Sequence, residues 1–301
     1  MFLKGLGFFL VFFSLLCPVW GQDFEVSFSV DWIGAEINSR VSFDLGQAGI
    51  RLPGGRFLAE EILQEAFPRL FRPCLLSIRY DSNSTIENLL ERGEISLRDL
   101  DILSMEADKS PPNLSGDLSR MIGNFNLSLE KISAYLRPHT RAFEANRPLV
   151  PVQTSEYTGI IIMAYEELPV HGRAGQALAE PSLFPKIWDT NMSLVYDRYM
   201  FEAGINDSFL MARYAGMESI FRPSPSGLEG ELAALLGPNP LRIFAQGVYG
   251  IHPTDLIIDR EDALRILSTE NNRRLLMEGR VLIVLNDEML LRGQGSGVRD
   301  Q

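Results

Sequence analysis

Apolar residues are spaced in two different ways along this chain, and the two spacings predict two kinds of β-strand. Near the N-terminus, residues Phe24–Trp32 alternate apolar and polar side chains, and residues Arg40–Leu45 do so again. This period of two predicts strands with one buried and one solvent-facing side, which we expect to pair as a hairpin. Residues Tyr157–Ala164 instead form a continuous apolar run, which is typical of a strand covered on both faces.

Helices are expected between the strands of the first half. The apolar positions of residues Arg56–Phe67 recur at helical spacing, and we expect Pro68 to end this helix because proline lacks the amide hydrogen for the next turn. A strand is expected over residues Leu75–Tyr80. Ser96 and Asp99 have the spacing of a capping box, which marks a helix start. Further helices are expected over residues 85–92, 96–107 and 127–136.

The second half alternates strands and helices. After the apolar run, strands are expected over residues 183–189, 193–196, 241–247, 255–259 and 280–285, and helices over residues 260–267 and 271–278. Strand–helix–strand alternation of this kind predicts a mixed α/β sheet. The expected fold class is therefore α+β in the first half and mixed α/β in the second.

Prolines mark a boundary between these two halves. Residues 137–154 contain three prolines and no clear periodicity, so we interpret them as a linker. The sequence thus predicts an N-terminal α+β unit over residues 22–136 and a C-terminal mixed sheet with flanking helices over residues 155–291. The glycine-rich residues 292–301 are expected to form a disordered tail.

Residues 1–21 have the features of a secretory signal peptide. Lys4 supplies a positive charge, and the apolar run Leu6–Leu16 is shorter than the roughly 20 residues that span a bilayer. Pro18 follows, and cleavage is expected just before Gln22. The sequence therefore predicts an exported protein of the periplasm or outer envelope.

Cys17 leaves a second possibility open, because a cysteine after an apolar run is the lipidation site of lipoproteins. The position before it holds Leu16 rather than a small residue, so the soluble form is favoured and a lipid anchor is the alternative. Membrane attachment is expected only if Cys17 is lipidated. After cleavage Cys74 is the one remaining cysteine, so no disulfide within the chain can form.

Charge and motif content exclude several functional classes. The chain carries a net charge of −11, which repels phosphate backbones, so we expect no nucleic-acid partner. The three histidines, His139, His171 and His252, are far apart in the sequence, so no local metal-ligand pair is present. Nucleophile-elbow, phosphate-loop and dinucleotide patterns are also missing. The sequence predicts no cofactor and no metal.

The best candidates for a binding site lie after the apolar run of the second half. His171 follows this predicted buried strand, and ligand-binding groups often lie beyond strand ends in α/β sheets. Glu167 lies four residues before His171. The hairpin predicted over residues 183–196 supplies a lysine, a tryptophan and an aspartate. The candidate binding residues are Glu167, His171, Lys186, Trp188 and Asp189.

A resemblance to known proteins rests mainly on segments of the second half. The segments, in order, are Tyr157–Ala164, Pro185–Asp189, Pro240–Gly247, Thr254–Asp259 and Gly279–Val284. This order resembles envelope proteins of the flagellar-assembly and small outer-membrane lipoprotein type. The chain as a whole resembles uncharacterised secreted proteins of Treponema-like spirochaetes. The resemblance implies an assembly or scaffolding role among envelope or flagellar proteins, and it transfers no catalytic residue.

Two functions from different classes follow. The first is a non-enzymatic protein of the cell envelope that binds other proteins. The alternative is a periplasmic hydrolase or small-ligand-binding protein whose site uses Glu167 and His171. A pocket that gathers the candidate residues would favour the alternative, whereas exposed apolar patches would favour the first.

Overall fold

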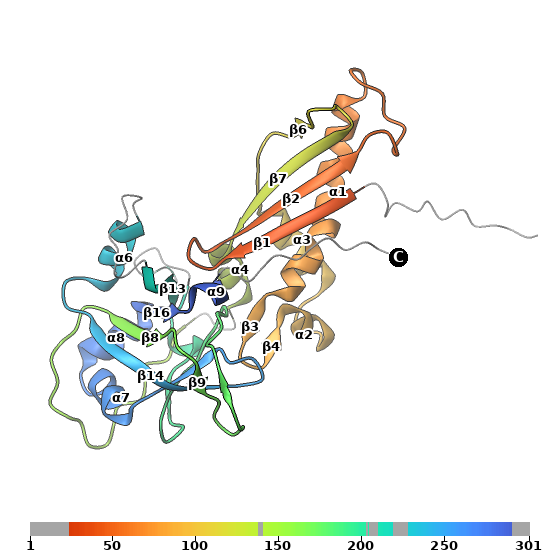
Figure 1. Cartoon of the computed structure of the whole chain (residues 1–301). Coiled ribbons are helices and arrows are strands. Elements are labelled where there is room, and N and C mark those ends of the chain that lie inside the picture. Colours follow the sequence, from red (N-terminus) through yellow and green to blue (C-terminus); the bar gives the residue numbers. More distant parts are fainter. Residues whose placement is uncertain (1–23, 138–140, 203, 205–209, 219–227, 291–301) are drawn as a thin grey trace, which may run out of the picture.

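The computed structural model describes residues 24–137, 141–202, 204, 210–218 and 228–290. It contains a five-stranded antiparallel sheet from the first half and a seven-stranded mixed sheet from the second. The first sheet and the long helix α1 extend away from the second sheet (Figure 1). The predicted signal peptide, Cys17 and the predicted tail lie outside the described residues.

The first sheet has the order β1-β2-β7-β5, with β6 also pairing with β7. Its strands are β1 (Phe24–Asp31), β2 (Glu36–Asp44), β5 (Asp108–Lys109), β6 (Asn113–Leu114) and β7 (Arg120–Ser128). The predicted hairpin of the first two strands is confirmed. Strand β7 was not predicted, yet it pairs with β2 over nine residues. Its side chains alternate between buried and more exposed positions, as do those of β2.

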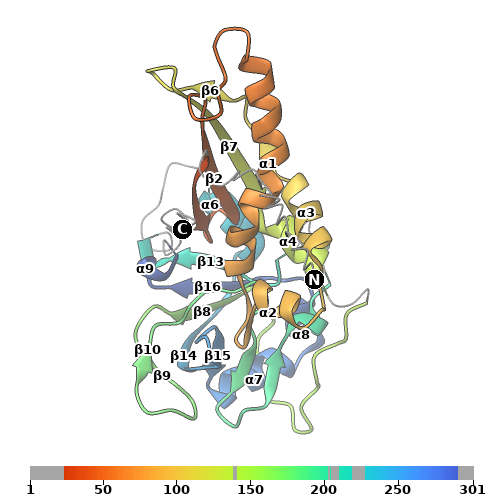
Figure 2. The ribbon, with the colours of Figure 1, turned by 90° about the vertical axis from the view of Figure 1, so that its right-hand side faces the viewer.

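Helix α1 (Arg56–Ser77) covers the apolar face of this sheet (Figure 2). Phe67 stacks on Phe125 of β7, with ring centroids 3.6 Å apart. The prediction that Pro68 ends the helix is wrong, because the helix continues through Pro68 and Pro73. Buried side chains on both sides of Pro68, such as Phe67 and Phe71, hold the helix on the sheet, and this packing offsets the lost backbone bond.

Three short helices and a small hairpin complete the first half. They are β3 (Arg79–Asp81), β4 (Ser84–Thr85), α2 (Ile86–Glu91), α3 (Leu97–Met105) and α4 (Leu129–Leu136). The predicted capping box of Ser96 and Asp99 is confirmed at the start of α3. The strand predicted over residues 75–80 is reduced to the short β3, because α1 extends to Ser77.

The second sheet has the order β12-β11-β15-β14-β8-β16-β13. Its strands are β8 (Ile160–Ala164), β11 (Ile187–Asp189), β12 (Leu194–Tyr196), β13 (Arg213–Gly216), β14 (Leu241–Tyr249), β15 (Asp255–Ile258) and β16 (Val281–Leu285). Every residue of β8 is buried, which confirms the strand covered on both faces. Strand β8 is parallel to β14 and β16, whereas β15 runs antiparallel to β14.

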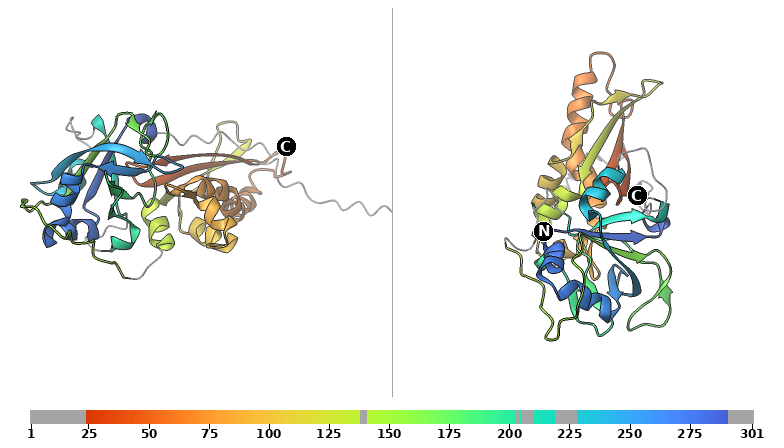
Figure 3. Two further views of the ribbon diagram at one scale, coloured as in Figure 1. Left: turned by 90° about the horizontal axis from the view of Figure 1, so that it is seen from below. Right: turned by 90° about the vertical axis from the view of Figure 1, so that its left-hand side faces the viewer.

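Helices contribute to the apolar clusters on both faces of β8. Helix α6 (Leu228–Leu236) contributes Leu236 to the apolar cluster that holds Ile161 and Met163. Ile160 and Ile162 point to the opposite side, because successive strand residues alternate faces. They share the main core with residues of α7 (Arg260–Leu267) and α8 (Glu270–Met277). These two helices lie at the end of the molecule away from the tip of α1 (Figure 3).

The described part of the second half contains four further short elements. They are β9 (Leu168–Pro169), β10 (Gln176–Ala177), the single 3-10 turn η1 (Arg198–Met200) and α9 (Asp287–Leu290). Strands β9 and β10 pair as a separate antiparallel ribbon. This ribbon carries the segment in which the sequence places His171.

Backbone hydrogen bonds join the two halves. The amides of Leu183 and Phe184 donate to the carbonyls of Arg79 and Tyr80, at 3.0 and 2.9 Å. Arg198 pairs with Asp81 across the same boundary, at 3.1 Å. Buried apolar residues from both halves belong to one continuous core cluster. The two sheets are therefore packed as parts of one body.

Residues 141–154, which belong to the predicted linker, contain no helix or strand. They are nevertheless tied to the second half. Glu144 pairs with the buried Arg273 at 2.9 Å, and the amide of Phe143 donates to the carbonyl of Tyr199 at 2.7 Å. Among the described residues, no helix combines the length and apolar character needed to cross a membrane.

Candidate functional site

Three aromatic side chains lie near one another, and they come from the turn after β9, from β11 and from the end of β14. The ring of Tyr249, at the end of β14, lies 5.9 Å from the ring of His171 and 6.1 Å from the ring of Trp188, both in edge-on geometry. The amide of His171 donates to the carbonyl of Val248 at 2.8 Å, so the β9 ribbon is fixed beside β14. We call His171, Trp188 and Tyr249 the aromatic cluster.

A buried carboxylate, that of Asp255, forms a hydrogen bond with one member of the aromatic cluster. Asp255, at the start of β15, is fully buried and pairs with Tyr249 in the sheet register. Its carboxylate accepts hydrogen bonds from the Trp188 indole Nε1 and from the Lys186 backbone amide, both at 3.0 Å. The indole therefore has a fixed orientation.

Burial is the main influence on the pKa of Asp255. Desolvation raises the pKa of its carboxyl above the ordinary value of 3.8, because the charged form loses its hydration. Hydrogen bonds from Trp188 and the Lys186 amide, together with the Lys186 charge, act in the opposite direction and only partly compensate. The group thus acts as a structural acceptor inside the sheet rather than as an exposed acid.

Lys186 adds a positive charge near the Trp188 ring of the cluster. Its Nζ lies 6.0 Å from the centre of the Trp188 ring, at the outer limit of a cation–π contact. The side chain is half-buried, as are those of Trp188 and Tyr249, while His171 is exposed. The surface of the cluster therefore combines aromatic rings with one ammonium group.

The other two candidate residues have different surroundings. Asp189 is buried and accepts hydrogen bonds from the amides of Asn191 and Ser193, at 2.9 and 2.7 Å, so it stabilises the turn between β11 and β12. Glu167 is exposed. Within the described ranges, it makes neither a hydrogen bond nor an ion pair, and it has no such contact with His171. The structure thus brings together His171, Lys186 and Trp188, but not Glu167 or Asp189.

Two central residues of the site were missed by sequence reasoning. Tyr249 lies two residues past the predicted end of its strand, and Asp255 begins a predicted strand without any sign of its role. A signal existed only in the combination of an aromatic residue and an acid on neighbouring strands. Recognising it requires the register that places Tyr249 opposite Asp255.

The surroundings of His171 are aromatic. Its ring lies beside that of Tyr249, and none of the described carboxylates forms a hydrogen bond or ion pair with it. In the part of the chain that the structure describes, no group of three histidine, cysteine, aspartate or glutamate residues could hold a metal ion. Fixed aromatic rings such as those of Trp188 and Tyr249 are common anchors of protein interfaces.

Comparison with known protein families finds a match for each half of the chain. Residues 23–135 match the N-terminal domain of Treponema pallidum Tp0624, and residues 159–287 match the second domain of the same protein. No curated protein matches the chain. The two matches follow the order of the domains in Tp0624 and support the resemblance to a Treponema-type protein.

Proposed function

We propose that this chain, which is built from two domains of the Tp0624 type, is an exported protein that binds other proteins of the cell envelope. Its role is non-enzymatic and lies in assembly or scaffolding, in the periplasm or outer envelope. Its partners are envelope proteins, those of the flagellum included. The sequence of residues 1–21 supports export, and the aromatic cluster supports the binding role.

The aromatic cluster is the observation that carries this proposal. Tryptophan and tyrosine dominate the binding energy of many protein interfaces, because each buries a large area at a low cost in conformational entropy. Trp188 is already fixed by its hydrogen bond to Asp255, so binding costs little further ordering. Ile251, two residues beyond Tyr249, is 61% exposed, which adds apolar area near the end of β14.

The alternative function, a hydrolase or small-ligand-binding protein, assigns the chemistry to Glu167 and His171. That function requires the two side chains to act on one substrate. It predicts that either Glu167→Ala or His171→Ala abolishes function while partner binding stays intact. The proposed binding role predicts that Glu167→Ala has no effect.

The test is cross-linking in the native envelope followed by identification of the linked proteins by mass spectrometry. We expect Trp188→Ala to reduce recovery of the main partner at least tenfold, since removal of a hot-spot residue costs about 2 kcal/mol or more. Phe57→Ala is the matched control, because Phe57 is 76% exposed and lies at the start of α1. The same sample shows whether the mature chain begins near Gln22.

Equal recovery with Trp188→Ala and Phe57→Ala would refute the binding role of the cluster. Circular dichroism of each variant separates lost binding from lost folding. An unprocessed chain found in the cytoplasm would refute export without touching the binding role.

A further inference from the structure

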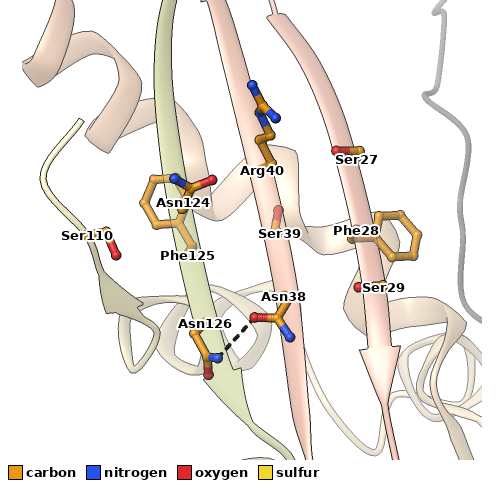
Figure 4. A pocket seen from close by; sticks show the side chains of 10 residues that line it. All are labelled: Ser27, Phe28, Ser29, Asn38, Ser39, Arg40, Ser110, Asn124, Phe125 and Asn126. Carbon is orange, nitrogen blue, oxygen red and sulfur yellow. Dashed lines mark hydrogen bonds between the residues drawn. The ribbon is translucent and has the colours of Figure 1, made fainter. Parts of the chain in front are cut away.

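The solvent-facing side of the first sheet holds a hollow of about 720 Å³ (Figure 4). It lies across β1, β2 and β7, far in sequence from the aromatic cluster. No binding role was assigned from the sequence to the residues that line the hollow. Ser27, Ser29, Asn38, Arg40, Asn124 and Asn126 line it, together with Phe28, Ser39, Ser110 and Phe125.

Strand register explains why polar side chains gather there. Residues opposite each other on neighbouring strands share a face, and the pleat sends alternate residues to opposite faces. The upper row of the hollow consists of Ser27, Arg40 and Asn124, and the lower row of Ser29, Asn38 and Asn126. The intervening row, which includes Ser39 and Phe125, is buried toward α1.

Arg40 provides the one positive charge among these side chains. Its guanidinium is exposed and has no hydrogen bond or ion pair within the described ranges. Arg120 on the same sheet is different, because it pairs with Glu25 at 3.1 Å and donates to Ser42. In a chain with a net charge of −11, an unpaired arginine leaves its planar set of donors available to an anion.

The lower row is held in place by a carboxylate. The side-chain amides of Asn38 and Asn126 both donate to the Glu36 carboxylate. The side-chain amide of Asn126 also donates to the side-chain oxygen of Asn38, at 3.1 Å. Within the described residues, the side-chain oxygen of Asn126 and the hydroxyls of Ser27 and Ser29 form no hydrogen bond. In the upper row, the side-chain amide of Asn124 has no partner in the described part of the chain. The hollow therefore offers both donors and acceptors.

This set of groups selects one chemistry. Amides and hydroxyls in two rows match a ligand with many hydroxyl groups, and the single guanidinium matches one carboxylate on it. The Glu36 carboxylate beside the lower row repels anionic groups, so the acidic group of the ligand belongs on Arg40 in the upper row. An apolar ligand would leave the polar side chains without partners.

We propose that this hollow binds an acidic saccharide, with the ligand carboxylate on Arg40 and its hydroxyls on the serine and asparagine side chains. The volume lies within the range of small-ligand sites, about 300–1,000 Å³. Because the hollow lies on an open sheet face, a sugar chain can extend beyond it on either side. This site is independent of the proposed protein-binding role.

The test is isothermal titration of the full chain with trigalacturonate, a sugar trimer with one carboxylate on each ring. Its methyl ester retains all the sugar hydroxyls but lacks the charges, and succinate supplies carboxylates without a sugar. We expect trigalacturonate to bind and both comparison ligands to bind at least tenfold more weakly. Arg40→Gln should weaken trigalacturonate binding about tenfold or more, because a hydrogen bond to a charged group is lost.

Arg120→Gln is the matched control, since Arg120 lies on the same sheet outside the residues that line the hollow. It should leave the affinity within twofold, and so should Trp188→Ala. Thermal unfolding of each variant confirms that the fold persists. Absence of trigalacturonate binding would overturn the proposal, as would equal affinity for succinate or an unchanged affinity of Arg40→Gln.

Discussion

The two sheets differ in how far their faces are buried. The first sheet buries one face under α1 and leaves the other face polar and open, whereas the interior strand β8 of the second sheet is buried on both faces (Figure 1). Ser, Asn and Arg side chains can therefore gather on the open face of the first sheet. In the second sheet, the aromatic cluster combines the end of β14, strand β11 and the turn after β9. Strand β14 also exposes alternate side chains, such as Phe244, so this sheet is not covered completely.

The largest expected effect contrasts the two sheets directly. Ile162 of β8 is fully buried, so Ile162→Ala should lower the free energy of unfolding by about 2–5 kcal/mol, because it removes apolar contacts and leaves a cavity. Ser29→Ala on the open face of the first sheet should change it by less than about 0.5 kcal/mol. Urea denaturation measures both. A similar loss of unfolding free energy in the two variants would mean that Ser29 is buried, which would contradict a solvent-exposed face of the first sheet.

A smaller effect contrasts the two faces within the first sheet. A Cβ atom at Gly123 of β7 would lie 2.7 Å from Leu63 Cδ2 and 2.9 Å from the Phe125 ring. Gly123→Ala should therefore cost about 1–3 kcal/mol through overpacking against α1. Asn124→Ala, one residue along the same strand but facing solvent, should cost far less. If Asn124→Ala is the more damaging of the two in thermal unfolding, the assignment of the two faces is wrong.

The smallest expected effect concerns pH and the second sheet. Because burial raises the pKa of Asp255 in the folded chain, the folded state binds this proton more tightly than the unfolded state does. The free energy of unfolding should then fall as pH rises from the ordinary pKa of 3.8 through the raised value, and level off above it. Asp255→Asn should flatten this part of the profile.

Asp262 also has a raised pKa, again mainly through burial, so the unaltered chain contains both contributions. The difference between its pH profile and that of Asp255→Asn isolates Asp255. Parallel profiles over this range, measured by urea denaturation at several pH values, would contradict the burial of a titrating carboxyl under Trp188.

Much of the fold follows from local sequence patterns. The alternating residues of β1 and β2 and the continuous apolar residues of β8 and β16 predict their strands correctly, because burial on one or both faces leaves a direct trace in the sequence. The capping box before α3 is equally local. In contrast, the end of α1 depends on contacts with the sheet, so Pro68 was a misleading signal.

The candidate site was predictable only in part. His171, Lys186 and Trp188 were named because they lie near strand ends, and the structure places them around Tyr249. Tyr249 and Asp255 became visible only with the register of β14 and β15. The polar hollow was missed because β7, which supplies Asn124 and Asn126, was not recognised as a strand. Contacts between distant strands leave no local trace in the sequence.

The most direct test is a crossed comparison of Trp188→Ala and Arg40→Gln in the same two assays. One assay measures recovery of the envelope partner after cross-linking, and the other measures trigalacturonate affinity by isothermal titration. We predict that Trp188→Ala loses at least tenfold in partner recovery and keeps its affinity for the sugar. Arg40→Gln should show the reverse. A loss of both properties in either variant, with the fold intact, would contradict two separate binding surfaces on the two sheets.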